Sequence, residues 1–235
     1  MSRNPYKILR NNIVEDEDDL IISISSLVDD SQECLLSNNN TINVACTNAR
    51  SIVEKIESLS TLFEENSLHL ALLTETWLTQ KACSVRRMND LTEGKNISFI
   101  RRDRGARGEG VAIAFNPTRI RMKKYNINNS DRKSEIICAV GTCSLTARKV
   151  AAISVYLSPS IRASELTVAM ETCVETISKL KTDFREPLVM VGDDFNGKDI
   201  SALLSAHCDL VAINAGATRN GRKLDKIYTL SLIHI

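Results

Sequence analysis

The stretch Leu188-Val189-Met190-Val191-Gly192-Asp193-Asp194-Phe195-Asn196 decides most of the fold prediction. Its first half is a short apolar run, which is typical of a strand buried on both faces. Two carboxylates and an amide follow where the run ends. In α/β sheets, ligand sites form just beyond the carboxyl ends of the strands. The stretch therefore predicts a buried strand that leads into a functional site.

Three other predicted strands also end in a polar residue. They are Ile42–Thr47 followed by Asn48, Leu70–Thr74 followed by Glu75, and Val150–Tyr156 ending in Tyr156. A single polar residue at a strand end is commonly a helix cap or a turn residue. Four such ends in one chain indicate that the side chains converge on one site.

The order of the remaining segments predicts the architecture. Helices are expected over 51–65, capped by Ser51, over 161–181 and near 199–206. Strands are expected near 97–102, 110–115, 119–125, 135–142, 209–213 and 224–228, and 79–96 is expected to be rich in loops. Strands alternate with helices at the two ends, and antiparallel strands occupy the middle. This order predicts an α/β domain of two mixed sheets packed face to face, with helices outside.

Residues 1–40 are predicted to lie outside this domain, which would span 41–235. They contain an acidic cluster at 15–33, a short apolar patch at Leu20–Leu27, and Asn38-Asn39-Asn40. Such a composition favours a mobile arm with at most one short helix.

Composition excludes some classes of protein and leaves others open. With 235 residues and 43% hydrophobic residues, the chain is large and apolar enough for one core, which excludes global disorder. The net charge is only +1, but positive residues gather between Arg86 and Lys133. That basic stretch suits a phosphate polymer, and it equally suits a set of solvated loops and hairpin faces.

The cysteine pattern and the length of the apolar runs indicate the cellular compartment. None of the seven cysteines forms a C-x-x-C pair, which disfavours both a disulfide framework and zinc. Cys46, Cys138, Cys143 and Cys173 stand among apolar residues, as buried free thiols do. The chain begins without a secretory signal pattern and has no apolar run near the ~20 residues that span a bilayer. We therefore expect an intracellular protein, nuclear or cytoplasmic, without membrane attachment.

The polar strand ends suggest metal-assisted hydrolysis. If the backbone stays extended, Asp194 and Asn196 project to one side, while Asp193 and Phe195 project to the other. A carboxylate and an amide on one side can orient a water and bind a phosphate oxygen. Glu75 on a neighbouring strand is the hard oxygen ligand that Mg²⁺ prefers.

Six short motifs, in order along 41–230, carry a resemblance to a known family. They are Thr47-Asn48-Ala49-Arg50-Ser51-Ile52, Thr74-Glu75-Thr76-Trp77-Leu78, Gly110-Val111-Ala112-Ile113, Val155-Tyr156-Leu157-Ser158-Pro159, Gly192-Asp193-Asp194-Phe195-Asn196 and Leu224-Asp225-Lys226-Ile227-Tyr228-Thr229. Together they resemble the endonuclease domain of non-LTR retrotransposons. That domain belongs to the endonuclease/exonuclease/phosphatase superfamily, which includes apurinic-site DNA repair nucleases.

The resemblance implies a four-layer α/β sandwich that hydrolyses a phosphodiester of DNA with Mg²⁺ or Mn²⁺, in a parent element that also carries a reverse transcriptase. It implies a role for each matched residue. Glu75 and Asn48 would hold the metal, Asp194 would orient or deprotonate the attacking water, Asn196 and Tyr156 would contact the phosphate, and Asp225 would orient a catalytic histidine. Arg50, Arg101, Arg102 and Arg104 would lie along the DNA backbone.

The chain departs from the family pattern in two places. Asp193 stands where relatives have glycine before the catalytic acid, and the 235 residues contain no Ser-Asp-His motif after Asp225. His234 follows Asp225 too closely to replace it, and His69 and His207 are interpreted as structural or surface residues. We therefore expect a C-terminally truncated domain that lacks its last strand and has impaired activity. The alternatives are a non-catalytic nucleic-acid-binding remnant and a phosphatase or phosphodiesterase of the same superfamily acting on a small ester.

Overall fold

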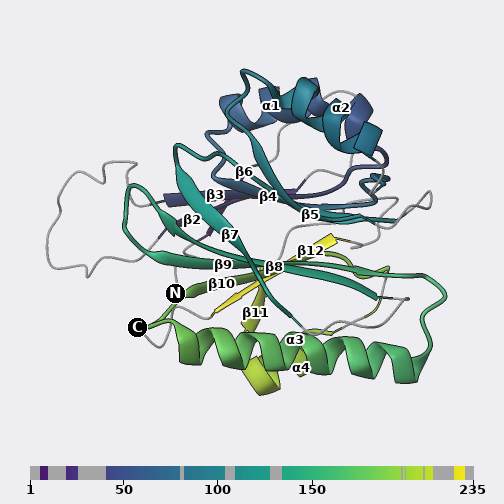
Figure 1. The fold of residues 1–235 in the computed structure, drawn as a ribbon. Helices are drawn as coiled ribbons and strands as arrows, with labels where there is room; N and C mark the ends of the chain where they lie inside the picture. Colours follow the sequence, from purple (N-terminus) through teal and green to yellow (C-terminus); the bar gives the residue numbers. More distant parts are fainter. Residues whose placement is uncertain are drawn as a thin grey trace, which may run out of the picture.

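Two six-stranded sheets pack face to face, and helices cover their outer faces (Figure 1). The computed structural model describes residues 6–9, 20–25, 41–79, 82–103, 109–127, 134–196, 198, 200–208, 210–213 and 225–230. The predicted α/β sandwich of two mixed sheets is confirmed.

The first sheet has the strand order β1-β2-β3-β4-β6-β5. Its strands are β1 (Tyr6–Leu9), β2 (Leu20–Ser25), β3 (Thr41–Asn48), β4 (Leu70–Thr74), β5 (Ser98–Arg102) and β6 (Val111–Phe115). Only β3 and β4 pair in parallel, and the other neighbours are antiparallel. The parallel pair places the ends of β3 and β4 together, with Asn48 opposite Thr74.

The second sheet has the order β11-β12-β10-β9-β8-β7. Its strands are β7 (Ile120–Tyr125), β8 (Ser134–Cys143), β9 (Lys149–Leu157), β10 (Leu188–Asp194), β11 (Leu210–Ile213) and β12 (Asp225–Leu230). Here β9 and β10 form the parallel pair. Because the two strands run parallel, their carboxyl ends also meet at one edge, and a helical crossover connects them.

The helices form the two outer layers. The 3-10 helix η2 (Ile52–Glu54), α1 (Ile56–Glu65) and α2 (Ala82–Thr92) lie over the first sheet, and α3 (Ala163–Asp183) and α4 (Ser201–Cys208) lie over the second (Figure 1). In α1 the apolar residues Ile56, Leu59, Leu62 and Phe63 recur at helical spacing and are all buried. A face of this kind is what drives such a helix onto a sheet.

Three apolar clusters fill the spaces between the four layers. One lies between the sheets, one between the second sheet and α3 and α4, and one between the first sheet and the helices over it. Strand alternation assigns the side chains: in β9, Val150 and Ala152 enter the central cluster, and Ala151 and Ile153 enter the cluster under α3. Each fully buried aliphatic side chain stabilises the fold by about 1.5–3 kcal/mol.

Close approach of the two sheets brings their carboxyl-end edges together. The hydroxyl of Ser154 in β9 donates to the carbonyl of Leu73 in β4 at 3.3 Å. At Gly192 in β10, an added Cβ would stand 2.6 Å from the Leu72 side chain. A larger residue there would require the Leu72 side chain to move. All four strand ends predicted to carry chemistry therefore lie at one edge of the sandwich, on the right in Figure 1.

The structure corrects the prediction for the N-terminal segment. The Leu20–Leu27 patch was expected to form at most a short helix, but Leu20–Ser25 is strand β2, paired with β3, and Tyr6–Leu9 pairs with β2. The sequence Leu-Ile-Ile-Ser-Ile-Ser is rich in β-branched isoleucine, which favours a strand over a helix. The other residues before 41 lie outside the described part of the chain.

Two local predictions in the first half are also wrong. Residues 79–96 were expected to be loops, but Ala82–Thr92 is helix α2, whose Met88 is buried. Ser51 was expected to cap a helix over 51–65. It precedes only the short turn η2 and makes no capping bond through its side chain, while α1 begins at Ile56.

The cysteine prediction is confirmed. Cys46, Cys138, Cys143 and Cys173 are free thiols in buried positions, and so is Cys208. Burial raises the pKa of the Cys173 thiol to about 12, so this group stays protonated and unreactive. None of the helices in the described ranges combines the length and apolarity needed to cross a membrane.

Candidate active site

Asn48 and Glu75 meet where β3 and β4 end. The side-chain amide of Asn48 donates to Oε1 of Glu75 at 3.0 Å, and its Oδ1 accepts the backbone N–H of Arg50 at 3.2 Å. Both side chains are half-buried, so they remain open to a ligand. The structure thus brings together two of the strand ends that were predicted to converge, and their expected role as metal ligands stays a prediction.

The loops that follow these two strands are fixed to one another by backbone hydrogen bonds. The N–H of Ser51 donates to the carbonyl of Glu75 at 3.0 Å, and that of Ile52 donates to Thr76 at 3.2 Å. Beyond β4, Trp77 donates to the carbonyl of Glu109 at 2.9 Å. Glu75 directly follows β4, and the backbone after it is held by hydrogen bonds between loops rather than by a regular strand.

Gly110 and Glu135 form a second support behind Glu75. The carboxylate of Glu135, which is fully buried, accepts the N–H of Gly110 at 2.8 Å. The carbonyl of Gly110 in turn accepts the N–H of Thr76 at 3.1 Å. Gly110 has φ +98°, and an added Cβ would collide with the Thr76 hydroxyl. Both facts require glycine at this position.

Backbone strain gathers around these residues. Of the eight non-glycine residues with positive φ in the described chain, five lie at this edge: Arg50, Ser51, Glu75, Trp77 and Asn196. Glu75 has φ 47° and Asn196 has φ 47°. Such residues persist where surrounding contacts determine the conformation, and they cluster at functional sites.

Tyr156 and Asn196 supply the facing half of the edge, from the second sheet. Tyr156 is half-buried near the end of β9, on the face that looks toward the first sheet. The amide of Asn196 donates to the carbonyl of Leu157 at 2.7 Å, so it is anchored beside Tyr156. The extended backbone assumed through Asn196 is wrong, because β10 ends at Asp194. The expected outward position of Phe195 holds, since it packs in the cluster under α3.

Asp194 and Asp225 are brought together in the backbone. The last pair of the antiparallel β10–β12 ladder joins Asp194 to Asp225, and the pair before it joins Asp193 to Lys226. The side chains of these four residues lie outside the described part, so the roles expected for Asp194 and Asp225 and the effect of Asp193 stay predictions.

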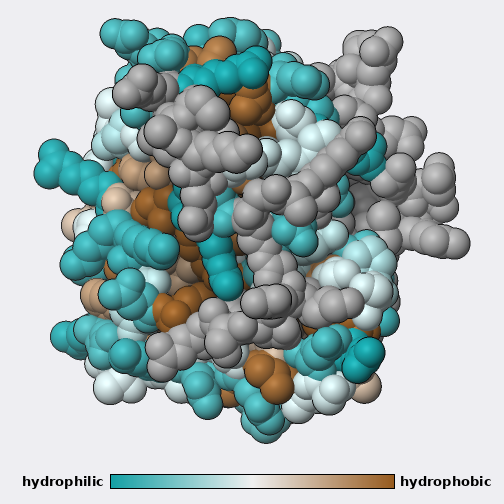
Figure 2. Space-filling view, turned by 45° about the vertical axis from the view of Figure 1, so that its right-hand side comes forward, coloured by the Kyte–Doolittle hydropathy of each residue, from teal (hydrophilic) through white to brown (hydrophobic). Residues whose placement is uncertain are grey.

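The four arginines predicted to contact DNA have different surroundings. Arg50 is half-buried next to Asn48, Arg101 forms an ion pair with Asp103 at 3.4 Å, and Arg102 donates to the carbonyl of Ile136 at 3.3 Å. Arg104 lies outside the described residues. Figure 2, which brings this edge toward the viewer, shows hydrophilic and hydrophobic side chains intermingled.

The described histidines do not enter this site. His69 is buried at the start of β4, where its Nδ1 accepts the N–H of Asn43 at 3.1 Å. Burial and the nearby Arg119 lower the pKa of His69 to about 4. His207 is exposed at the end of α4. The structural and surface interpretations of these two residues are confirmed, and His234 lies outside the described part.

The donor set at the edge suits a hard divalent cation. Among the side chains that the structure describes, no three of His, Cys, Asp and Glu cluster. Mg²⁺ commonly needs only one or two carboxylates and keeps several waters. The Glu75 carboxylate, oriented by Asn48, provides a group of that kind.

The strand order, the four layers and the site edge define a class of fold, that of the endonuclease/exonuclease/phosphatase proteins. The chain is similar to the human Nocturnin catalytic domain, solved with bound sulfate, at TM-score 0.58 and 13% identity over 80% of this chain and 81% of that one. It is similar to D. rerio TDP2 complexed with single strand DNA product, at TM-score 0.56 and 11% identity over 83% and 85%.

The endonuclease domain of TRAS1, a telomere-specific non-LTR retrotransposon, is also similar, at TM-score 0.52 and 15% identity over 80% of this chain and 84% of that domain. No family model matches the chain, and no curated protein matches it in sequence. At these identities the likeness establishes the fold alone. The expected resemblance is confirmed at that level.

Sequence reasoning missed Glu135 and the support it forms with Gly110. A glutamate at the start of the apolar run Ile136–Val140 was the available signal, because carboxylates are rarely fully buried without a partner. The register of β8 and β9 explains why Glu135 lies at the site edge, because Glu135 pairs with Tyr156 across that ladder.

Proposed function

We propose that the chain is a metal-dependent phosphodiesterase domain that nicks DNA and derives from a non-LTR retroelement. The observation that carries the proposal is the hydrogen bond between Asn48 and Glu75 at adjoining strand ends, facing Tyr156 and the anchored Asn196. The likeness to TRAS1 and to TDP2 with its DNA product supports the choice of DNA.

Each residue has a defined part in this proposal. Glu75 and Asn48 would hold Mg²⁺ or Mn²⁺, which when bound neutralises charge on the phosphate. Asn196 and Tyr156 would donate hydrogen bonds to phosphate oxygens, and fixed donors of this kind stabilise charge that develops in a transition state. Asp194 would take the proton of the attacking water. Asp225, which pairs with Asp194 in the β10–β12 ladder, would orient a catalytic histidine.

We also propose that hydrolysis by these 235 residues is slow. They contain no Ser-Asp-His motif, so the catalytic histidine that the resemblance implies is not among these residues. Groups that act as a unit in catalysis lose several orders of magnitude in rate when one member is lost.

Nicking of supercoiled plasmid with Mg²⁺ tests both parts. The expected result is slow, metal-dependent nicking that Asp194→Ala abolishes. Rapid nicking would contradict the impaired activity. Salt-sensitive DNA binding without cleavage, unaffected by chelator or by Glu75→Ala, would instead support a binding module. Turnover of a soluble phosphate ester without DNA binding would support a small-ester hydrolase.

A further inference from the structure

A cavity lies at the opposite edge of the second sheet, on its outer face. Alternation turns Arg121 and Lys123 of β7, Thr142 of β8 and Lys149 of β9 to that face. Arg121, Thr142 and Lys149 occupy paired positions across the ladders, and Lys123 pairs with Val140. Helix α3 covers the middle of the face but ends at Asp183, and the chain then returns to β10 through Phe184 and Pro187. The outer face therefore stays uncovered beside these two residues.

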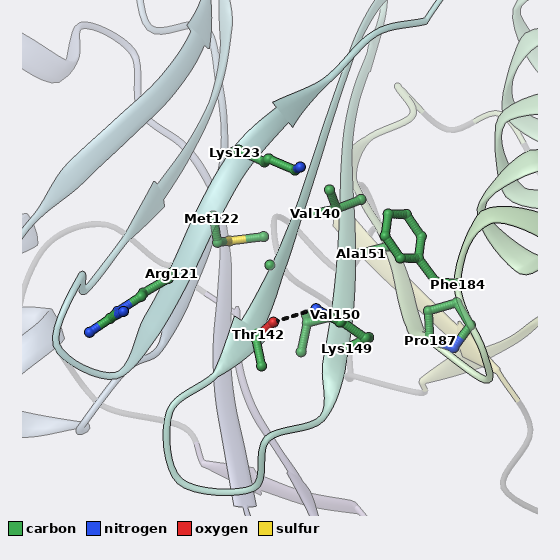
Figure 3. A pocket seen from close by; sticks show the side chains of 11 residues that line it. Arg121, Met122, Lys123, Val140, Thr142, Lys149, Val150, Ala151, Phe184 and Pro187 are labelled. Atoms are coloured by element: carbon green, nitrogen blue, oxygen red, sulfur yellow. Dashed lines mark hydrogen bonds between the residues drawn. The ribbon is translucent and has the colours of Figure 1, made fainter.

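The cavity has an apolar wall and floor. Its volume is about 260 Å³, and Val140, Val150, Ala151, Phe184 and Pro187 contribute its apolar surface. Figure 3 shows the Phe184 ring standing beside Val140 and Ala151, with Pro187 below it. The ring is held by Tyr125, whose centroid is 6.4 Å away and whose hydroxyl bonds Asp183 at 2.6 Å. It is a flat surface already in place for a planar ligand.

The polar part of the cavity is positively charged. Arg121, Lys123 and Lys149 line it, and of the eleven described lining residues none is acidic. The ammonium of Lys149 is held by the Thr142 hydroxyl at 2.9 Å, as the dashed line in Figure 3 shows. The nearest acids along the chain are Asp183, which is bonded to Tyr125, and Glu186, and neither lines the cavity. Three cations without a carboxylate among them attract an anion.

We propose that this cavity binds a nucleoside monophosphate, with the phosphate at Lys123 and Lys149 and the base against Phe184 and Pro187. The same chemistry is presented by a free nucleotide and by the phosphorylated end of a nucleic-acid strand. The cavity shares no residue with the candidate active site, so the proposal stands whether or not the chain cleaves DNA.

Isothermal titration of the 235-residue chain with AMP, adenosine and inorganic phosphate tests this site. AMP is expected to bind saturably at one site, and adenosine and phosphate at least tenfold more weakly, because each has only half of the contacts. The double variant Lys123→Ala/Lys149→Ala is expected to lose at least tenfold in AMP affinity. Phe184→Leu should weaken AMP binding and leave phosphate binding unchanged.

Arg87→Ala is the matched control, since Arg87 is an exposed cation on α2 in the other outer layer. It should leave AMP binding unchanged, and thermal melts should show every variant folded. The proposal is overturned if AMP fails to saturate, if the double variant binds as the parent does, or if Glu75→Gln removes the binding. A 5′-phosphorylated oligothymidine, titrated into Glu75→Gln, separates the two sources: tighter binding than AMP assigns the site to a strand end, and weaker binding assigns it to the free nucleotide.

Discussion

The two edges of the sandwich carry positive-φ residues of different kinds. At the edge opposite the candidate site, Ser67 follows α1, Ala147 lies in the β8–β9 turn and Glu186 precedes β10. These are isolated residues of ordinary turns. At the site edge, Arg50, Ser51, Glu75 and Trp77 belong to two loops that bond each other through their backbones.

This difference shows which positive-φ residues indicate a functional site. A left-handed residue at a turn follows from chain reversal alone. A left-handed glutamate that is half-buried, bonded to Asn48 and supported by neighbouring loops needs a further reason for being kept. The need to hold the Glu75 carboxylate in a position that an extended strand would not give it is such a reason. The predictions below test it.

Glu75→Gln should have the largest effect. The substitution keeps shape and the bond to Asn48 but removes the negative charge that would hold a cation. Losing one principal electrostatic group costs roughly 10²–10³-fold in rate, which plasmid nicking with Mg²⁺ measures. Glu64→Gln on the exposed face of α1 is the control and should nick at the parental rate. Equal nicking by the two variants would remove Glu75 from the site.

Gly110→Ala compares the edges directly, because Gly94 at the far edge is also left-handed. Gly94 has φ +75° and nothing within 4 Å of an added Cβ, whereas Gly110 would collide with Thr76. Gly94→Ala should cost about 1 kcal/mol from backbone strain alone. Gly110→Ala should cost about 3 kcal/mol, since overpacking adds to strain. Urea unfolding measures both, and equal losses would contradict the tight packing behind Glu75.

The strands and the convergence of Asn48, Glu75, Tyr156 and Asn196 could be predicted because one physical pattern controls both. An apolar run long enough for a buried strand must end, and the first polar residue after it emerges at the sheet edge. Where side chains alternate regularly, as in β9, the sequence pattern also separates the side chains that face the other sheet from those that face the helices.

The rest depended on contacts that local pattern does not contain. The hydrogen bond from Asn196 to Leu157 could not be predicted, because β10 ends two residues before Asn196 and the backbone is no longer extended there. The support from Glu135 arises from pairing between β8 and β9, which is far from Gly110 in sequence. Helix α2 was missed because its sequence has only a narrow apolar stripe, Val85, Met88 and Leu91, although that spacing of three was a usable signal.

His69 predicts acid sensitivity of the far edge. Its folded pKa of about 4 lies below its ordinary value of 6.5, so between these values the unfolded chain binds a proton that the folded chain does not. Stability is therefore full above pH 6.5 and falls as pH drops toward 4, by about 2–3 kcal/mol. Unfolding at a series of pH values measures this. His69→Gln should flatten the dependence in that window and His207→Gln should not. The same slope in all three proteins would assign it to other groups.

Ser154→Ala should have the smallest effect. It tests whether one hydrogen bond between the sheets is needed to align the two halves of the site. Its hydroxyl bonds Leu73 across the sheets, and removing it should cost about 1 kcal/mol in urea unfolding. We expect nicking to stay within twofold of the parent, because the close approach at Gly192 and the apolar cluster between the sheets already fix their spacing. Ser158→Ala, which removes a hydroxyl from the exposed turn after β9, is the control for losing a hydrogen bond outside the core. If Ser154→Ala slows nicking more than tenfold while stability falls as expected, this single bond aligns Glu75 with Tyr156, and the alignment of the edge is local rather than a property of the packed sheets.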